Sequence, residues 1–259
     1  MINKTIRAKK RFGQNFLIDQ NVISTIIKTA KPSGKEIIEI GPGQGAITTY
    51  LLGSAKKVTA YEIDKDMVSI LNKKISAPHF ELIQGDFLEA KFEWEGKKDV
   101  VANLPYYITT DILFKIFDSI EKFSKLTIMV QDEVAERIIA KKNTPQYGKL
   151  SVSCQFLANV KKIIKILPES FYPQPRVNSA VVVLEFKENI DKEFMNFFLE
   201  FIKACFFMKR KKLENNLKVF MSKDQIKEIY SKLNLKPNVR PQELDLEEFL
   251  EIFKMWRER

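Results

Sequence analysis

The sequence predicts an α/β protein: a doubly wound sheet of mostly parallel strands, followed by a small all-helical domain. Two patterns support this fold class. Over most of the chain, short β-branched runs alternate with amphipathic segments of helical length, which is typical of strands joined by crossover helices. From about residue 190 onward only helical periodicity remains. We therefore expect two domains, residues 1–188 and residues 189–259.

The first half of the chain supplies most of the expected sheet. A first helix is expected at residues 19–31, where Asp19 is a suitable N-cap and four aliphatic residues follow at helical spacing: Val22, Ile23, Ile26 and Ile27. We then expect strands at 36–40, 57–63, 80–85, 99–103 and 126–131, with helices at 45–53, 65–76 and within 110–122. This alternation favours parallel strands with helices on both faces.

The second half changes character. A helix is expected at 149–157 and a strand at 161–167; the proline-rich turn "ESFYPQPRVNS" and the apolar strand "AVVVLEF" follow, so these two strands should pair at one edge of the sheet. Later segments such as "KDQIKEIYSKL" and "DLEEFLEIFKMW" have helical periodicity, the second with an aspartate cap. An apolar stripe at helical spacing predicts the packing face of the helical domain: Phe194, Phe197, Phe198, Phe201 and Ile202.

Composition excludes several classes of protein. No apolar run approaches about 20 residues, so no membrane span is expected. The N-terminus lacks the apolar core of a signal peptide, which favours a cytoplasmic protein. The chain has a single histidine, His79, and two widely separated cysteines, Cys154 and Cys205. We therefore expect no metal site, and we expect His79 to be structural.

The chain is basic, with 43 Lys and Arg against 33 Asp and Glu and a net charge of +10. This balance favours a polyanionic partner, either nucleic acid or an anionic membrane. Basic residues are concentrated near the N-terminus and in the segment 203–218. The candidates for contacts with nucleic acid are Lys9, Lys10, Arg11, Lys209, Arg210, Lys211 and Lys212.

A glycine-rich turn joins a predicted strand to a predicted helix in "EIIEIGPGQGAITTYL". Gly41 and Gly43 would let the backbone approach a ligand closely, beside a helix N-terminus. The turn lacks the third glycine of the dinucleotide motif G-x-G-x-x-G, and no Walker lysine follows it. A nucleoside without a pyrophosphate therefore fits best, and we expect S-adenosylmethionine.

Polar residues end the next three strands: Glu62, Asp86 and Asn103. The carboxyl ends of parallel strands meet at one edge of a sheet, where ligands bind in such folds. Glu62 is placed to accept hydrogen bonds from both ribose hydroxyls, and Asp86 from an adenine amino group. Together with Gly41 and Gly43, these residues predict the cofactor site.

The tetrapeptide "NLPY" (103–106) predicts the chemistry. The exocyclic amine of adenine is a poor nucleophile because its lone pair is delocalised into the ring. The Asn103 side-chain oxygen and the Leu104 carbonyl would each accept a hydrogen bond from one N–H of this amine. These two bonds would draw the nitrogen toward tetrahedral geometry and free its lone pair. Tyr106 offers a face on which the extruded base can stack. No strong base is needed, since the methylated amine becomes acidic and can lose its proton to water.

With "NLPY" and "EIGPGQG", the sequence resembles the adenine-N(6) methyltransferases. Further segments narrow the resemblance to the small-subunit ribosomal RNA adenine N(6)-dimethyltransferases, the KsgA/Dim1 family: "KKRFGQNFL", "PQYGKLSV", "FYPQPRVNSAVV", "FFMKRKKLENNL" and "RPQELDLEEF". The resemblance runs over essentially the whole chain. One departure is the basic segment "KRKKL", where the family has a paired arginine and a threonine before the leucine, so a specific phosphate contact there is in doubt.

The resemblance implies a Rossmann-like methyltransferase domain and transfer of four methyl groups to two adjacent adenosines. These lie in a hairpin loop near the 3′ end of small-subunit rRNA, methylated during ribosome biogenesis. It carries over the cofactor positions Asn15, Leu17, Gly41, Glu62, Asp86 and Asn103. Phe171, on the proline-rich turn, would sandwich the target base against Tyr106. The implied partner is small-subunit rRNA in an assembling subunit, bound by a monomer whose domain 189–259 contacts the rRNA.

Three alternatives stay open. A 23S-type resistance methyltransferase shares the fold, the cofactor and the "N-[LI]-P-[YF]" chemistry, but "FYPQPRVNSAVV" and "RPQELDLEEF" favour the small-subunit enzyme. DNA adenine methyltransferases more often carry an Asp-Pro-Pro-Tyr motif. A non-catalytic assembly factor with a vestigial pocket would not need Gly41, Glu62, Asp86 and the complete tetrapeptide.

Overall fold

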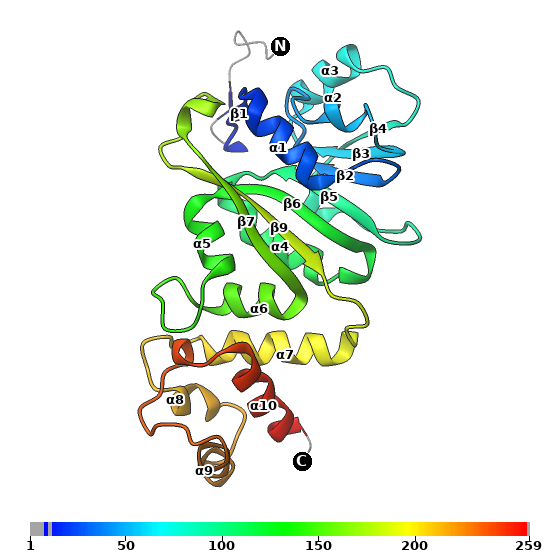
Figure 1. Ribbon diagram of the computed structural model, residues 1–259. Coiled ribbons are helices and arrows are strands. Elements are labelled where there is room, and N and C mark those ends of the chain that lie inside the picture. Colours follow the sequence, from blue (N-terminus) through cyan, green and yellow to red (C-terminus); the bar gives the residue numbers. More distant parts are fainter. Residues whose placement is uncertain (1–7, 10–11, 258–259) are drawn as a thin grey trace. The chain divides into compact units, whose positions relative to one another are not determined.

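The computed structural model describes residues 8, 9 and 12–257, and its contacts divide the chain into two compact units (Figure 1). The first unit comprises the described residues up to Ala135, together with Lys161–Phe186. The second comprises Glu136–Val160 and the residues from Lys187 onward. This division departs from the expected boundary at 188/189 in residues 136–160, which belong with the C-terminal helices.

The main sheet has seven strands in the order β4-β3-β2-β5-β6-β9-β7. Their bounds are β2 (Glu36–Ile40), β3 (Lys57–Glu62), β4 (Phe80–Gln84), β5 (Lys98–Asn103), β6 (Phe123–Gln131), β7 (Ala158–Ile166) and β9 (Ser179–Phe186). The pairs from β4 to β6 are parallel, and β9 joins β6 antiparallel. The expected doubly wound sheet is confirmed, with β9 beside β7 at one edge.

Helices cover both faces of this sheet. α1 (Gln20–Ala30) and α2 (Thr48–Leu51) pack on one face, in an aliphatic core that includes Ile37, Val101 and Val181 of the sheet. α4 (Thr109–Phe117) covers the other face. Its Phe117 packs edge-on against Phe186 of β9, and Phe186 lies on the opposite face of the sheet from Val181 because side chains alternate along a strand. α3 (Lys65–Lys74) follows β3, and α5 (Asp132–Ile139) follows β6.

Some local predictions were inaccurate. The helix expected at 45–53 is a single turn, α2. Residues before Thr48 form turns, in which Gly45 has a φ of +80°, and Gly53 follows shortly after the helix ends. A two-stranded ladder was not expected: β1 (Phe16–Leu17) pairs antiparallel with β8 (Phe171–Tyr172). Such short strands have no periodicity to detect.

The second unit is helical, as expected for the C-terminal part. Its helices are α6 (Lys149–Leu157), α7 (Lys192–Cys205), α8 (Leu213–Leu217), α9 (Lys223–Lys232) and α10 (Leu246–Arg257). Reciprocal bonds between Ser222 and Gln225 cap α9, and Asp191 caps α7. Aromatic residues of α6, α7 and α10 pack together in the core; the ring centres of Phe156 and Phe198, for example, lie 4.5 Å apart at a tilt of 52°.

The phenylalanine stripe is therefore core, with one exception. Phe198, Phe201 and Ile202 are fully buried, but Phe197 is 48% exposed and lies under the Arg257 guanidinium, 4.6 Å from the ring centre. The core-facing residues of α7 recur at positions 194, 198, 201, 202 and 205, and Phe197 falls outside this spacing.

Candidate functional site

A cavity of about 170 Å³ opens at the carboxyl ends of the parallel strands in the first unit. It lies where the strand order reverses, between β2 and β5, the position at which open α/β sheets bind ligands. Gly41 and Gly43 after β2, Glu62 at the end of β3, Asp86 after β4 and Asn103 at the end of β5 all line it. The structure thus brings together the residues that strand-end reasoning selected.

The glycine turn forms one wall of the cavity. Gly41 and Gly43 have φ values of +68° and +55°, in the left-handed region that side chains disfavour. A Cβ on Gly43 would lie 3.2 Å from the Phe16 ring. A side chain at this position would therefore be strained by its φ and would crowd the Phe16 ring.

Glu62 is fixed in place by the backbone. One carboxylate oxygen accepts a hydrogen bond from the Gly43 N–H at 3.0 Å, and the other accepts from the Asp64 N–H at 2.8 Å. The side chain is 5% exposed, and burial raises the pKa of Glu62, although these backbone bonds oppose the shift. Each oxygen retains a second lone pair, so the carboxylate is suited to accepting a pair of hydroxyl groups.

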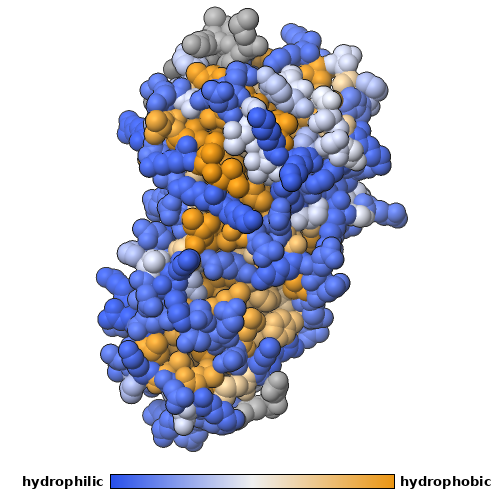
Figure 2. All heavy atoms as spheres, viewed as in Figure 1, coloured by the Kyte–Doolittle hydropathy of each residue, from blue (hydrophilic) through white to orange (hydrophobic). Residues whose placement is uncertain are grey.

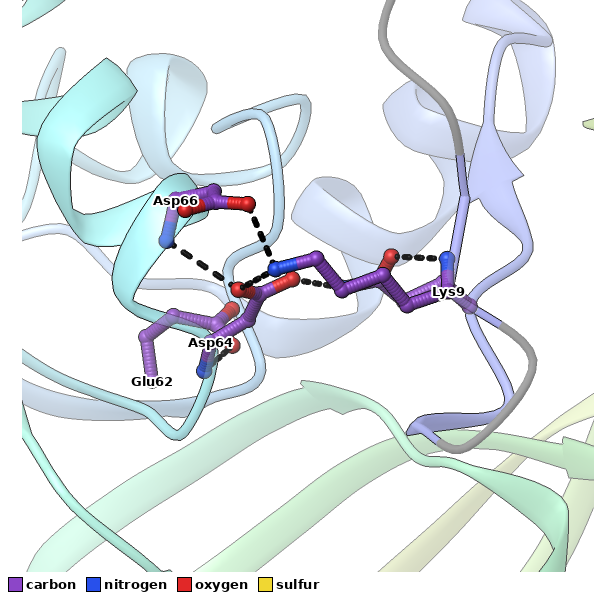
Figure 3. Close-up of polar contacts among 5 residues, drawn as sticks. Lys9, Glu62, Asp64 and Asp66 are labelled. Atoms are coloured by element: carbon purple, nitrogen blue, oxygen red, sulfur yellow. Dashed lines mark hydrogen bonds and ion pairs between the residues drawn. The ribbon is translucent and has the colours of Figure 1, made fainter.

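The N-terminal segment is tied to the loop after β3 (Figure 3). Asp64 caps α3 and also binds the Lys9 ammonium at 2.5 Å and the Gln14 amide at 2.8 Å. Lys9 contacts Asp66 as well, at 2.5 Å. Burial would raise the pKa of Asp64, but its bonds to Lys9, the Asp66 N–H and Gln14 outweigh this and lower it. These contacts hold residues 12–16 along the cavity.

Asn103 faces this N-terminal segment. Its side-chain nitrogen donates to the Asn15 carbonyl at 3.1 Å. Because that contact orients the amide, the Asn103 side-chain oxygen is the group left to accept from a ligand. Asp86, which also lines the cavity, accepts a bond from the Leu88 N–H at 2.9 Å.

Leu104 and Tyr106 also line the cavity. The Tyr106 hydroxyl bonds to the hydroxyl of Ser179, a fully buried residue at the start of β9, at 2.6 Å. Burial raises the pKa of Tyr106, while the Ser179 bond lowers it in part. The phenol is thereby anchored, so the ring is held as a fixed surface at the cavity wall.

Two expected site residues do not line the cavity. Leu17 and Phe171 pair with each other between β1 and β8, and both belong to the aliphatic core with Met129 and Val181. Phe171 is 1% exposed, so it offers no face to a base in this structure. Successive side chains of a strand point to opposite faces, so Phe16 faces the cavity and Leu17 faces the core.

The expected RNA-binding residues differ in their surroundings. Lys9 forms the ion pairs with Asp64 and Asp66, whereas Lys10 and Arg11 lie outside the described residues. In the second unit, the Lys209 ammonium donates to the Pro145 carbonyl at 2.9 Å. Arg210, Lys211 and Lys212 are exposed.

Sequence reasoning missed several residues of the cavity wall, among them Phe12, Gln14, Phe87 and Tyr107. Tyr107 follows the tetrapeptide and is 59% exposed at the cavity. The doubled tyrosine in "NLPYYI" was an available signal, since two adjacent aromatics after a strand are more than the core requires. Gln14 gave no local signal, because its partner is 50 residues away.

The described part of the chain lacks the features of a metal centre or a membrane-spanning helix. It contains no group of three or more His, Cys, Asp or Glu side chains able to hold a metal ion. Within it, no helix is both long and apolar enough to cross a membrane. His79 contacts the Leu52 carbonyl at 3.0 Å and is not part of the cavity wall. Cys154 and Cys205 are buried free thiols, and burial raises the pKa of both.

The chain is similar to known proteins in both sequence and structure. A family model described as "Ribosomal RNA adenine dimethylase" matches residues 5–258. The "Ribosomal RNA small subunit methyltransferase A" of Mesomycoplasma hyopneumoniae (strain 232) is 50% identical over 244 residues, which are 94% of each chain. The protein of the same name from Lactobacillus johnsonii is 41% identical over 273 residues, covering 98% of this chain and 92% of its own.

Two solved structures resemble the whole chain. A dimethyladenosine transferase from Plasmodium falciparum has a TM-score of 0.79 at 26% identity, covering 94% of this chain and 98% of its own. The 23S rRNA methyltransferase ErmE has a TM-score of 0.73 at 24% identity, covering 93% and 99%. The second likeness shows a shared fold alone.

Proposed function

Because this chain belongs to the ribosomal RNA adenine dimethylase family, we propose that it dimethylates two adjacent adenosines of small-subunit rRNA, with S-adenosylmethionine as methyl donor. The targets are the exocyclic amines in a hairpin loop near the 3′ end, in an assembling subunit in the cytoplasm. The observation that carries this proposal is the position of Asn103, Leu104 and Tyr106 in the same cavity as Glu62 and the glycine turn.

The cavity residues fit a nucleoside cofactor. Gly41 and Gly43 line the cavity with backbone alone, and a Cβ at Gly43 would crowd the Phe16 ring. The oriented carboxylate of Glu62 suits a ribose, and Asp86 suits an adenine amino group. When bound, S-adenosylmethionine supplies an electrophilic methyl group. Asn15, a cofactor position that the resemblance implies, also lines the cavity.

Asn103 activates the target amine. Its side-chain nitrogen is held by the Asn15 carbonyl, so its oxygen accepts one amine N–H, and the Leu104 carbonyl accepts the other. Both acceptors favour a tetrahedral amine nitrogen with a localised lone pair. This contact strengthens as the nitrogen pyramidalises, which is how binding energy accelerates a step.

Tyr106 holds the extruded base by stacking. Its hydroxyl is fixed by Ser179, so little ring freedom is lost when a base binds. The amine proton leaves to water after methylation, and the sole histidine, His79, takes no part. Phe171 would have to leave the core to reach the base, so we assign the stacking face to Tyr106.

The helical residues 189–259 are proposed to contact the rRNA, as the exposed cations Arg210, Lys211 and Lys212 suggest. The test of the whole proposal is incubation with labelled S-adenosylmethionine and one of three acceptors: small-subunit particles, large-subunit particles or duplex DNA. The label should enter small-subunit rRNA as N(6),N(6)-dimethyladenosine at two adjacent positions.

Each other outcome identifies a rival function. Label in large-subunit rRNA would support the 23S-type enzyme, and label in DNA a DNA methyltransferase. Binding of small-subunit particles without any label would support a non-catalytic assembly factor. Mass spectrometry of the digested nucleosides separates dimethylation from monomethylation.

A further inference from the structure

Phe207 has no structural explanation within its own unit. It lies in the turn between α7 and α8 and is 84% exposed, more than any other described large hydrophobic side chain. Hydrophobic and hydrophilic residues are interleaved over much of the visible surface, so moderate exposure is ordinary (Figure 2). A nearly fully exposed aromatic ring is not, because it leaves apolar area in water without compensation.

The turn that carries Phe207 is well braced. The Met208 N–H donates to the Asn216 side chain at 3.0 Å, and Asn216 is itself buried in the second unit. The Lys211 N–H donates to the Met208 carbonyl at 2.9 Å, which closes the turn. The Lys209 ammonium reaches the Pro145 carbonyl at 2.9 Å. The exposed ring is thus presented by a fixed backbone rather than by a frayed helix end.

The residues beside Phe207 are basic. Residues 206–212 contain four cations and no acid, and Arg210, Lys211 and Lys212 are exposed. The Lys209 ammonium is bonded internally, and burial lowers the pKa of Lys209, so it serves mainly to brace the turn. An exposed ring on a braced turn, next to exposed cations, matches the chemistry of unpaired nucleotides, which offer flat bases and adjacent phosphates.

We propose that Phe207 is a stacking platform for an unpaired base of the RNA substrate, while Arg210, Lys211 and Lys212 hold the neighbouring phosphates. This inference rests on the proposed function, which makes RNA the partner, and adds a second aromatic contact remote in sequence from the tetrapeptide. Phe197, in the preceding helix α7, provides a contrast: its ring is also exposed, but the Arg257 guanidinium lies over it. It is the matched control.

Stacking and phosphate contacts respond differently to salt. Loss of a phosphate contact flattens the dependence of log affinity on log salt, whereas loss of a stacking contact lowers affinity by the same factor at every salt concentration. Phe207→Ala should therefore weaken binding to unmethylated small-subunit particles by about fivefold to a hundredfold with an unchanged slope. Phe207→Leu should weaken it similarly, Phe207→Trp should retain it, and Phe197→Ala should bind like the wild type.

Two further measurements complete the test. Tryptophan emission of Phe207→Trp, corrected for the two native tryptophans, should be quenched by the RNA. In methylation assays, Phe207→Ala should raise KM for the particles and leave kcat unchanged, since Phe207 is not among the residues that line the cavity.

The inference is overturned by several results. Wild-type affinity of Phe207→Ala, or of Phe207→Leu, would remove base stacking. Unquenched emission would place the ring away from the RNA. If Phe207→Ala loses the binding of the wild type to vesicles rich in anionic lipid but keeps its binding to RNA, the ring contacts a membrane surface instead. In each of these cases wild-type methylation of small-subunit rRNA would still support the proposed function, so the two failures are distinguishable.

Discussion

At the residue scale, Glu62 has an environment suited to a ribose. Two backbone N–H groups orient its buried carboxylate toward the cavity. Glu62→Ala should weaken S-adenosylmethionine binding by about one to a few kcal/mol, the range expected for a lost charged acceptor. Isothermal titration calorimetry measures this, with circular dichroism as a check on folding. Glu81→Ala is the control, because Glu81 is paired with Lys57 and is not among the cavity-lining residues. Equal affinities in the two variants would remove Glu62 from the site.

Asn103 should affect chemistry rather than RNA binding. Asn103→Ala removes the amide oxygen proposed to accept from the target amine, so methyl transfer should fall by orders of magnitude. Single-turnover assays measure the chemical step, and filter binding measures RNA affinity, which should survive. Tyr106→Phe serves as the control, since it loses the Ser179 bond but keeps the ring, and it should methylate at nearly the wild-type rate. A near-normal rate in Asn103→Ala would show that the amine is oriented by another group.

Glu39 is a buried acid that the proposed chemistry does not use. It lies in β2, is 2% exposed, and its Oε2 atom has no hydrogen-bond partner within the described residues. Burial raises the pKa of Glu39 to about 8, and the negative charge of Glu62 adds to the shift. Between about pH 4.5 and about pH 8 the folded protein therefore keeps a proton that the unfolded chain releases. The free energy of unfolding consequently falls as pH rises through this range.

Glu39→Gln should remove that dependence. As pH rises through this range, the free energy of unfolding of the variant should increase relative to that of the wild type by at most about 1.4 kcal/mol per pH unit. Urea unfolding at a series of pH values measures the difference between the curves. Glu36→Gln is the control: the pKa of Glu36 is lowered by its bonds to Lys98 and Lys56, so its variant should not gain in this range. Parallel curves for Glu39→Gln and the wild type would mean that Glu39 ionises normally.

At the scale of elements, the N-terminal segment depends on a few contacts. Lys9 and Gln14 hold it to Asp64 at the start of α3 (Figure 3). Lys9→Ala should loosen residues 12–16, so that their backbone amides exchange faster and S-adenosylmethionine binds more weakly. Hydrogen exchange with mass spectrometry tests the first effect, and calorimetry the second. Lys56→Ala removes another lysine ion pair, with Glu36, that is remote in sequence from the segment, and should change neither. Unaltered exchange in Lys9→Ala would show that the remaining bonds suffice.

The position of each expected site residue shows which parts of the cavity wall could be predicted from the sequence. Gly41, Glu62, Asp86 and Asn103 could be predicted, because the carboxyl ends of parallel strands converge whatever the side chains. The link from Gln14 to Asp64 could not, since it joins residues with no local relation. Phe171 was expected to contact the target adenine base, but it pairs with Leu17 and its side chain is buried in the core. Long-range pairing of two-residue strands leaves no trace in hydrophobic periodicity.

At the scale of the whole molecule, the order of elements followed from the sequence and their grouping did not. The strands and the C-terminal helices were expected, because periodicities of 2 and 3.6 residues are local properties. Residues 136–160 were expected with the sheet, yet α6 packs among the phenylalanines of α7 and α10. An amphipathic helix reveals that one face is buried but does not reveal which partner buries it. The functional roles given to residues 1–188 and 189–259 remain predictions.

Selection of one RNA also belongs to the whole molecule, since a pocket for adenine cannot distinguish among RNAs. The net charge of +10 gives general attraction to RNA, and the exposed cations beside Phe207 can give local contacts. Replacement of Arg210, Lys211 and Lys212 with glutamine should reduce the slope of log affinity against log salt by about 2 to 3, since each lost phosphate contact contributes somewhat under one. Binding to small-subunit particles should weaken most at low salt.

Lys209→Gln is the matched control for this triple replacement. It removes the same charge from the same turn, but the Lys209 ammonium is already bonded to the Pro145 carbonyl, so the slope should stay near that of the wild type while the unit loses stability. The affinity of the triple variant for S-adenosylmethionine should be unchanged, because Arg210, Lys211 and Lys212 are not among the residues that line the cavity. If the triple variant keeps the wild-type slope, these cations only solubilise the helical unit, and selection of the RNA must come from other residues.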